Sequence, residues 1–356
     1  MNLLDKIKNI WPFGQSHKMR AIGFERPLLI DQPDAFVEKV IPRPQPDKDE
    51  LLVKVLASSV NPVDTKMRAN YTHDGVFRIL GFDAVGVVVE VGQNVQHFSV
   101  GDKVYYAGAQ LKPGSNADLQ VVHEALVGHA PTSLSDEEIA AMPLTSITAY
   151  EILHEALCYD LEENSALGHT ILIVNGAGGV GSVLIQLAKY IGMTVITTAS
   201  RTESVTWVKS LGADYILDYH QDLNEQMRKI QHDKVDNIAI LQNTDYYWSL
   251  ATAVIKPFGR IASIVETTEP IDMGPLKNIG AQFSWVFMFA KGNYGVNMQS
   301  QGNALNQVAR LLDENKMKTT LSKTYHGLSV ENIRAATKEV EAGRMIGKVV
   351  VKYDEQ

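Results

Sequence analysis

Residues 170–192, which read TILIVNGAGGVGSVLIQLAKYIG, decide the fold. An apolar run of strand length is followed by apolar residues at helical spacing, and the glycines between them form G-x-G-x-x-G. Glycine is needed in such a turn because the chain bends tightly, a pyrophosphate approaches the backbone, and the helix packs closely on the strand. The pattern predicts a dinucleotide-binding turn, although a glycine-rich turn serving packing alone is the alternative. Its residues are Gly176, Gly178, Gly179, Val180 and Gly181.

The residues after the next strand run, 194–199, indicate which dinucleotide binds. A site for NAD has an acidic residue there to accept from the ribose 2′-hydroxyl, whereas this chain has Ser200 and Arg201. A hydroxyl and a guanidinium suit a 2′-phosphate, so we predict NADPH as the cofactor. Glu203 falls in the following turn. The alternative is that Arg201 is an ordinary solvated arginine.

Outward from this turn, strand runs alternate with helical patterns. The strand runs are 170–176, 194–199, 215–219, 236–242, 259–265 and 281–289. This alternation predicts an α/β domain over 143–315 with a doubly wound, parallel, six-stranded sheet of the Rossmann type. Helical patterns at about 303–315 and 329–342 precede a last strand run, 347–353.

The N-terminal part has a different pattern. Runs 51–60 and 84–92 are rich in valine and bounded by turn residues, which predicts a β-rich domain. Ser135 and Glu138 have the spacing of a helix capping box. We expect the last strand to return to this domain, which would then comprise 19–142 and 316–356. Residues 1–18 are expected to form a loosely ordered leader.

Composition narrows the class of protein. The 356 residues carry a net charge of −8, which argues against nucleic acid as a partner. There is no apolar run of the length that a membrane span needs. The single cysteine, Cys158, excludes an intrachain disulfide and is expected to be a buried, inert thiol. We therefore expect a cytoplasmic protein.

Several motifs together carry a family resemblance. They are NPVD (61–64), Gly81-x-Asp83-x-x-Gly86, PLTSITAY (143–150), NGAGGVG (175–181), LGADYILDY (211–219) and GKVVV (347–351). The chain resembles the medium-chain dehydrogenase/reductase superfamily, most closely its quinone oxidoreductase (zeta-crystallin) branch and the zinc-type alcohol dehydrogenase-like proteins. The resemblance covers about residues 19–352 and implies that the β-rich domain is GroES-like.

The chain departs from the zinc-dependent members of that superfamily. Where those place a zinc ligand, this chain has Asn61, Phe82 and Leu144. Phenylalanine and leucine cannot bind zinc and asparagine binds it poorly, so we expect no metal. Without a Lewis acid, the resemblance implies hydride transfer from NADPH to an electron-poor acceptor in a cleft between the domains. A quinone is the first expectation and an enone or enoyl thioester the second. A third alternative is an NADPH-binding structural or redox-sensing protein with little turnover.

The resemblance also names candidate catalytic residues. It places Asn61 and Asp64 in the cleft. The alternative is that NPVD forms a turn. For Asp64 we expect a structural role, paired with Arg68. Tyr71 resembles the proton donor of related enoyl-thioester reductases, but a loop tyrosine is the alternative. His73 beside it is expected to be a solvated loop histidine.

Further resemblances concern the cofactor and a partner. Tyr219 resembles a tyrosine near the 2′-phosphate, and Lys348 a basic residue near the cofactor that could equally be a surface lysine. Asn243 follows the fourth strand, at the edge of the sheet where a cofactor lies. The apolar segment 283–289 is predicted to be the edge strand, and the resemblance implies a homodimer through it.

Overall fold

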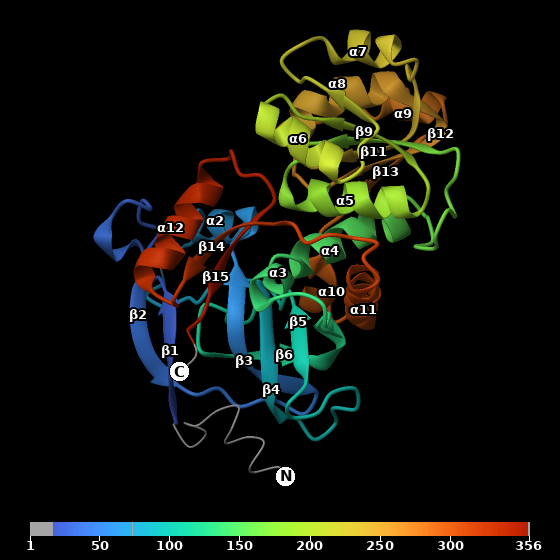
Figure 1. Cartoon of the computed structure of the whole chain (residues 1–356). Coiled ribbons are helices and arrows are strands. Elements are labelled where there is room, and N and C mark those ends of the chain that lie inside the picture. Colours follow the sequence, from blue (N-terminus) through green and yellow to red (C-terminus); the bar gives the residue numbers. More distant parts are fainter. Residues whose placement is uncertain (1–16, 73, 355–356) are drawn as a thin grey trace. The chain divides into compact units, whose positions relative to one another are not determined.

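The computed structural model describes residues 17–72 and 74–354. The expectations for His73 and for most of the leader 1–18 therefore lie outside the described residues, and Lys18, expected in the leader, instead begins the first strand. Two compact units are present (Figure 1). Unit 1 comprises residues 1–144, 289–315 and 319–356, and unit 2 comprises 145–288 and 316–318. No helix among the described residues has the length and apolarity to cross a membrane.

Unit 2 contains the predicted six-stranded sheet. Its strands are β8 (Thr170–Val174), β9 (Thr194–Thr198), β10 (Tyr215–Leu217), β11 (Val235–Ile240), β12 (Ile255–Ser263) and β13 (Gln282–Trp285). The order is β10-β9-β8-β11-β12-β13 and every neighbouring pair is parallel, which confirms the doubly wound topology. The predicted edge strand is present but shorter than expected, because β13 ends at Trp285.

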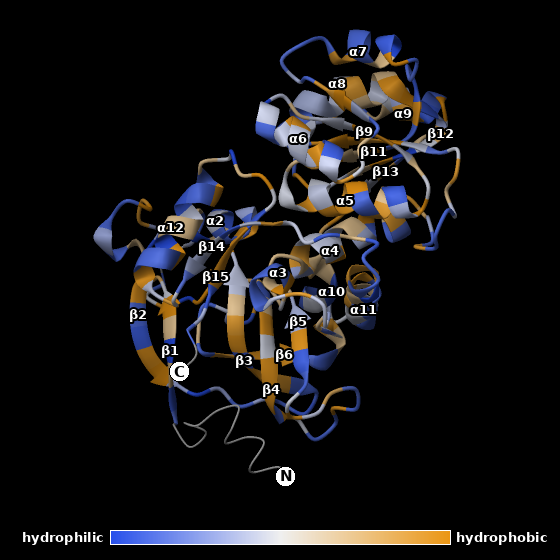
Figure 2. Ribbon diagram, in the orientation of Figure 1, coloured by the Kyte–Doolittle hydropathy of each residue, from blue (hydrophilic) through white to orange (hydrophobic). Residues whose placement is uncertain are grey.

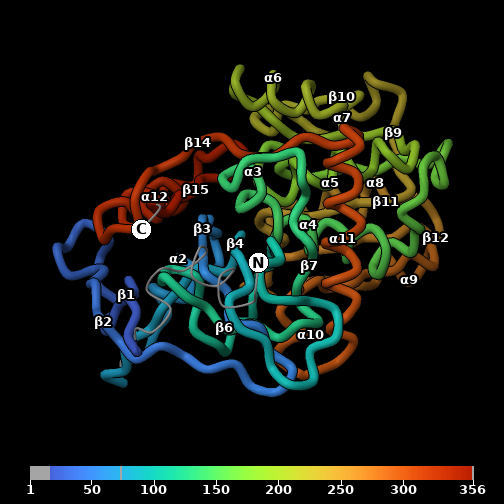
Figure 3. The backbone as a smooth tube through the Cα atoms, turned by 60° about the horizontal axis from the view of Figure 1, so that its bottom comes forward, coloured from blue at the N-terminus to red at the C-terminus, as the bar shows by residue number. Residues whose placement is uncertain are grey.

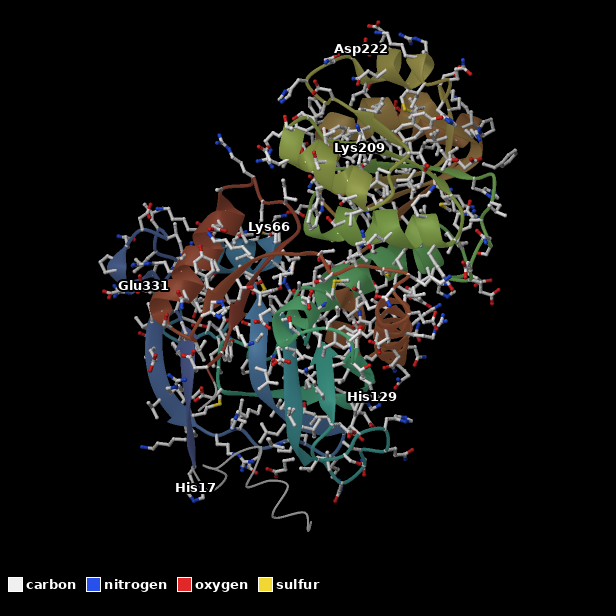
Figure 4. The ribbon with its side chains drawn as sticks, viewed as in Figure 1. His17, Lys66, His129, Lys209, Asp222 and Glu331 are labelled. Carbon is white, nitrogen blue, oxygen red and sulfur yellow. The ribbon has the colours of Figure 1, made fainter. Side chains whose placement is uncertain are left out.

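Helices precede and connect these strands. They are α4 (Pro143–Tyr150), the π-helical turn η3 (Glu151–Ala156), α5 (Gly179–Tyr190), α6 (Thr202–Ser210), α7 (Leu223–Lys229), α8 (Thr244–Val254) and α9 (Gly274–Asn278). Val183, Leu184 and Leu187 of α5 are fully buried. Gly192 follows the helix with φ 88°, a left-handed conformation that glycine adopts without strain. Charged side chains such as Lys209 of α6 and Asp222 before α7 lie on the exposed surface of this unit (Figure 4).

Unit 1 is the predicted β-rich domain. β1 (Lys18–Gly23) and β2 (Val37–Pro42) form an antiparallel pair. The larger sheet consists of β3 (Glu50–Ser59), β4 (Asp83–Val91), β5 (Lys103–Tyr106), β6 (Leu119–His123), β7 (Val127–His129), β14 (Leu321–His326) and β15 (Lys348–Lys352). Its order is β14-β15-β3-β4-β5-β7, with β6 pairing with β3. The expected return of the C-terminal strand is confirmed, since β15 pairs antiparallel with β3. Apolar residues run along β3 and β4 (Figure 2).

Short helices and two longer ones complete unit 1. They are η1 (Pro33–Ala35), α2 (Pro62–Ala69), η2 (Glu124–Leu126), α3 (Asp136–Ala140), α10 (Phe289–Tyr294), α11 (Gln299–Asp313) and α12 (Val330–Glu341). The expected capping box of α3 is present: Glu138 N donates to Ser135 Oγ at 3.4 Å, and Ser135 N donates to Glu138 Oε2 at 2.9 Å.

Residues 289–315 differ from the expected domain boundary. We expected them in the nucleotide-binding domain, but they cluster with unit 1, where α11 runs beside β7 (Figure 3). The Tyr105 hydroxyl donates to Leu305 O at 2.5 Å, and Asp313 accepts from the backbone N–H groups of Thr132 and Ser133. Helical periodicity shows that a segment has an apolar face but not which sheet that face covers, so the sequence could not settle this assignment.

Candidate functional site

The glycine-rich turn joins β8 to α5, as predicted. A Cβ atom on Gly176 would lie 2.0 Å from Thr197 Oγ1, and one on Gly181 would lie 2.4 Å from Asn175 O. These two glycines are therefore required by packing within the unit. Gly178 is different, because the atoms nearest to its Cβ position all belong to Asn175, the closest at 3.0 Å. The space beside Gly178 allows a ligand to approach the backbone closely.

The turn leads directly into a helix N-terminus. Gly178 caps α5, whose first turn includes Gly179, Val180 and Gly181 and contains no acidic residue. The first backbone N–H groups of an α-helix have no acceptor in a preceding turn, and the helix dipole adds partial positive charge there. This end of α5 can hold the phosphates of a dinucleotide.

The end of β9 fits a 2′-phosphate. Ser200 Oγ is shielded from solvent and has no hydrogen-bond partner among the described residues. Arg201 is the N-cap residue of α6, and Glu203 lies inside that helix, as expected. A buried hydroxyl without a partner is costly, and a phosphate oxygen would satisfy it. The residues present therefore fit NADPH, and no carboxylate stands at the strand end where NAD would need one.

The other predicted nucleotide residues follow neighbouring strands. β9 and β11 flank β8, so the strand order reverses beside the glycine turn. Asn243 follows β11 with φ 46°, and its Oδ1 accepts from Tyr246 N at 3.0 Å. Tyr219 is half-buried, two residues after β10, with its ring 4.6 Å from that of His220. Carboxyl ends of parallel strands share one sheet edge. We call the residues at this edge the nucleotide edge: Gly176–Gly181, Ser200, Arg201, Tyr219 and Asn243.

A second group of residues surrounds Asp83 in unit 1. Asp83 is fully buried at the start of β4. Its Oδ2 accepts from Ser59 Oγ at 2.5 Å, Asn61 Nδ2 at 2.8 Å and Lys348 Nζ at 2.8 Å. Its Oδ1 accepts from Leu144 N at 2.6 Å. We call these residues the Asp83 cluster: Ser59, Asn61, Asp83, Lys348 and the backbone N–H of Leu144.

Lys348 corrects one expectation. Its side chain is 1% exposed, so the alternative of a surface lysine is wrong. The ammonium group donates to Asp83 Oδ2, to Asn61 Oδ1 and, at 3.4 Å, to Val60 O. These three acceptors match its three N–H groups. Lys348 therefore lies within the Asp83 cluster.

Asn61 and Asp64 are also tied into this buried region. Both ends of the Asn61 amide are engaged, the nitrogen by Asp83 and the oxygen by Lys348. Asp64 Oδ2 accepts from Asn61 N at 2.8 Å, and its Oδ1 accepts from Gly81 N at 2.9 Å. Burial raises the pKa of Asp64 to about 7, although both backbone bonds favour the carboxylate.

The expected pairing of Asp64 with Arg68 is wrong. The Arg68 guanidinium donates to Glu341 of α12 and to Leu28 O. Because both Asp64 oxygens already accept from backbone N–H groups, those of Asn61 and Gly81, the carboxylate is turned away from the next turn of α2. The role of Asp64 in this structure is to hold the start of α2.

The three positions of the expected zinc ligands do gather around Asp83. Asn61 donates to it, Leu144 donates through its backbone, and Phe82 precedes it. The Phe82 ring is buried and packs 4.7 Å from that of Phe289. Asn61 Oδ1 is the one side-chain atom at these three positions that could coordinate a metal ion. It already accepts a hydrogen bond from the Lys348 ammonium group. This set of side chains does not fit a zinc ion.

Tyr71 lies at a loop with its hydroxyl engaged. It bonds to Asp74 and, at 3.0 Å, to Val76 O. The bond from Tyr71, with further bonds from Val76 and Arg78, lowers the pKa of Asp74 to about 2. The Tyr71 ring packs edge-on against Phe24 at 5.2 Å. To protonate a substrate, this phenol would first have to leave Asp74.

Cys158 differs from its expected burial. It is exposed, with φ 60°, and follows the π-helical turn η3. Its Sγ contacts Glu155 O at 3.7 Å. The left-handed backbone that ends this turn directs the residue outward, which apolar neighbours in the sequence did not reveal.

The pair of Asp83 and Lys348 was missed because 265 residues separate its members. A signal was present, however. Asp83 precedes the apolar run 84–89, and Lys348 precedes Val349, Val350 and Val351. A charge at the start of a buried strand needs an opposite charge nearby. Each of these two residues therefore indicates that a partner exists, but not which residue it is.

Comparisons with known proteins agree with the β-rich unit and the six-stranded parallel sheet described above. The family model described as alcohol dehydrogenase GroES-like domain matches residues 47–134, and the zinc-binding dehydrogenase model matches residues 211–351. A zinc-type alcohol dehydrogenase-like protein of Staphylococcus aureus is 40% identical over 334 residues, covering 94% of this chain and 99% of that protein. The 2-methylene-furan-3-one reductase of Solanum lycopersicum is 31% identical, covering 88% of this chain and 74% of that protein. The quinone oxidoreductase structure from Coxiella burnetii is 27% identical with a TM-score of 0.78, covering 95% of this chain and 100% of that one.

Proposed function

Because the chain belongs to the medium-chain dehydrogenase/reductase superfamily of oxidoreductases, we propose that it is a zinc-independent, NADPH-dependent reductase of quinone-like acceptors. The observation that carries the proposal is the set of side chains around Asp83. Asn61, Phe82 and Leu144 stand where zinc-dependent members have ligands, and the one donor atom among their side chains already accepts from Lys348. These residues offer no way to hold a metal that would polarise an alcohol.

The nucleotide edge supports NADPH as the cofactor. In this proposal the backbone of Gly178–Gly181 binds the pyrophosphate, while Ser200 and Arg201 bind the 2′-phosphate. Gly178 leaves room for the close approach, and Ser200 Oγ gains the partner that it lacks. NADPH, when bound, supplies the hydride. Asn61, Asp64 and Tyr71 remain the proposed catalytic positions, with Tyr219, Asn243 and Lys348 as further cofactor positions.

An acceptor that takes a hydride without a metal must be electron-poor. A quinone satisfies this requirement because its ring carbons and carbonyl groups are conjugated. The likeness to the Coxiella burnetii quinone oxidoreductase favours this class. The tomato relative is named for reduction of an enone, which favours that class as the second candidate. Enone reduction needs a proton at the carbon next to the carbonyl, for which Tyr71 is the candidate donor.

The test is NADPH oxidation at 340 nm without added metal, against one ortho-quinone and one α,β-unsaturated ketone, each repeated with a chelator. We expect chelator-resistant turnover of the quinone. Turnover of the ketone alone, lost in Tyr71→Phe, would support the enone reductase instead. Tight NADPH binding without turnover of either would favour the structural or sensing role. Chelator-sensitive activity would contradict a zinc-independent enzyme.

Cofactor choice has its own test. Arg201→Asp removes the guanidinium and introduces a charge that repels a 2′-phosphate. We expect the KM for NADPH to rise at least tenfold, about 1.4 kcal/mol, while the KM for NADH changes little. Equal effects on both cofactors would contradict binding of a 2′-phosphate by Arg201.

We also propose that the protein is a cytoplasmic homodimer. Within the described residues β13 is the edge strand of the unit 2 sheet, and Trp285 and Phe287 are each 52% exposed. An edge strand with exposed aromatic residues is normally covered. Sedimentation equilibrium of the wild type and of Trp285→Asp checks the assembly, and a monomeric wild type would contradict it.

A further inference from the structure

Tyr246 is an exposed aromatic residue that the nucleotide edge described above does not include. It lies in the first turn of α8, directly after β11, and its backbone N–H donates to the capping side chain of Asn243. Its side chain is 64% exposed. Because β11 pairs with β8 up to Val174, both strands end at the same level of the sheet. Tyr246 therefore belongs to the sheet edge that carries the glycine-rich turn.

The Tyr246 ring is not isolated. It packs edge-to-face on Tyr247, with ring centroids 4.8 Å apart and an interplanar angle of 80°. Tyr247 is buried against the core of unit 2, so it fixes the position of its neighbour. Burial, with smaller contributions from the nearby Tyr246 and Tyr219, raises the pKa of Tyr247 to about 12. The hydroxyl of Tyr247 is therefore neutral at physiological pH.

The charged residue that precedes Tyr246 is held by another part of unit 2. The carboxylate of the preceding Asp245 is turned to Thr268, accepting from its backbone N at 2.9 Å and its hydroxyl at 2.8 Å. These bonds hold the pKa of Asp245 below its usual range. Tyr246 thus presents an exposed aromatic ring beside the nucleotide edge. The other aromatic residue of that edge, Tyr219, is the one for which the resemblance implies a place near the 2′-phosphate.

The chemistry of NADPH suggests what covers this face. Its pyrophosphate and 2′-phosphate match the helix N-terminus of α5 and the pair Ser200–Arg201, which leaves the adenine base without a partner. A purine gains most from stacking on an aromatic ring. Resting on the proposed NADPH dependence, we propose that Tyr246, supported by Tyr247, forms the adenine-binding platform of this protein.

Direct binding of adenosine 2′,5′-bisphosphate, measured by calorimetry, tests the platform without any turnover. This probe carries the base and the 2′-phosphate but no nicotinamide. We expect Tyr246→Ala to raise its Kd about tenfold, equivalent to about 1.4 kcal/mol, because a stacked base is worth about 1–3 kcal/mol. Tyr246→Phe keeps the ring and is expected to stay within about twofold of the wild type.

Phe258→Ala is the matched control. Phe258 is also an exposed aromatic residue of unit 2, 80% exposed, but it lies near the amino end of β12. We expect no change in Kd, with circular dichroism showing that both alanine variants are folded. Unchanged binding in Tyr246→Ala, or equal weakening in both alanine variants, would overturn the platform while leaving the proposed function intact. A wild type that binds neither the probe nor NADPH would overturn the proposed function, and the platform with it.

Discussion

The nucleotide edge and the Asp83 cluster are built in opposite ways. At the nucleotide edge, the binding groups are backbone N–H groups and side chains at strand ends, with only Asn175 close to the Cβ position of Gly178 and, within the described residues, no partner for the Ser200 hydroxyl. In the Asp83 cluster, the carboxylate has four donors and the ammonium three acceptors, and both groups are buried. The first region has unmet bonding capacity for a ligand. In the second region, the bonding capacity of the two charged groups is already met within the protein.

The largest expected effect tests whether the Asp83 cluster is one unit. Asp83→Asn leaves Lys348 buried without its counter-charge and is expected to lower the free energy of unfolding by about 3–5 kcal/mol. Lys348→Met leaves Asp83 uncompensated and is expected to cost a similar amount. The double variant should recover most of the loss, because neither charge remains. Urea unfolding of all four proteins measures the coupling, and additive losses would show that the two residues do not act as a pair.

Asp64 provides a smaller, pH-dependent effect in the same unit. Its pKa is raised to about 7 in the folded protein, above its value in the unfolded chain. The folded state therefore binds a proton more tightly, and its stability falls as pH rises toward 7. Between pH 5 and pH 8 we expect the wild type to lose about 3 kcal/mol more than Asp64→Asn, at 1.36 kcal/mol per unit. Parallel stability profiles of the two proteins would contradict a raised pKa.

The smallest effect separates two glycines of the nucleotide edge. Gly176→Ala would press its methyl group on Thr197 Oγ1, which donates to Ile173 O at 2.8 Å and cannot move freely. We expect a loss of stability of about 1–3 kcal/mol. In Gly178→Ala the nearest atoms to the new methyl group belong to Asn175, the closest being its side-chain nitrogen at 3.0 Å, so the melting temperature should hardly change while NADPH affinity falls. A stable Gly176→Ala protein, or full NADPH affinity in Gly178→Ala, would show that the two glycines do not divide their roles in this way.

Recognising a motif in this sequence did not show what its residues contact. NPVD and GKVVV were recognised in the sequence, but their residues proved to be partners of each other through Asn61 and Lys348. Asp64 was expected to bond to Arg68, its neighbour one turn along α2, and instead accepts from two backbone N–H groups. A motif indicates that a residue is needed, whereas the groups that surround this residue in the folded protein decide its role.

The sequence alone determined the alternation of strands and helices, the glycine-rich turn and the presence of a last strand run after the C-terminal helical patterns. It could do so because these features depend on local hydrophobic periods and on glycine at fixed spacing. It also placed Asn61, Phe82 and Leu144 where a zinc ligand is expected. These are properties of short segments, and such properties can be predicted from the sequence of the segment alone.

Only the tertiary structure decided which distant groups meet. It paired Asp83 with Lys348, assigned α10 and α11 to the β-rich unit, and brought Cys158 to the surface. It also placed Tyr246 on Tyr247 at the nucleotide edge. Such contacts arise when whole elements bury their apolar faces against one another, and the charge or aromatic ring that ends up nearby carries no local signal of its partner.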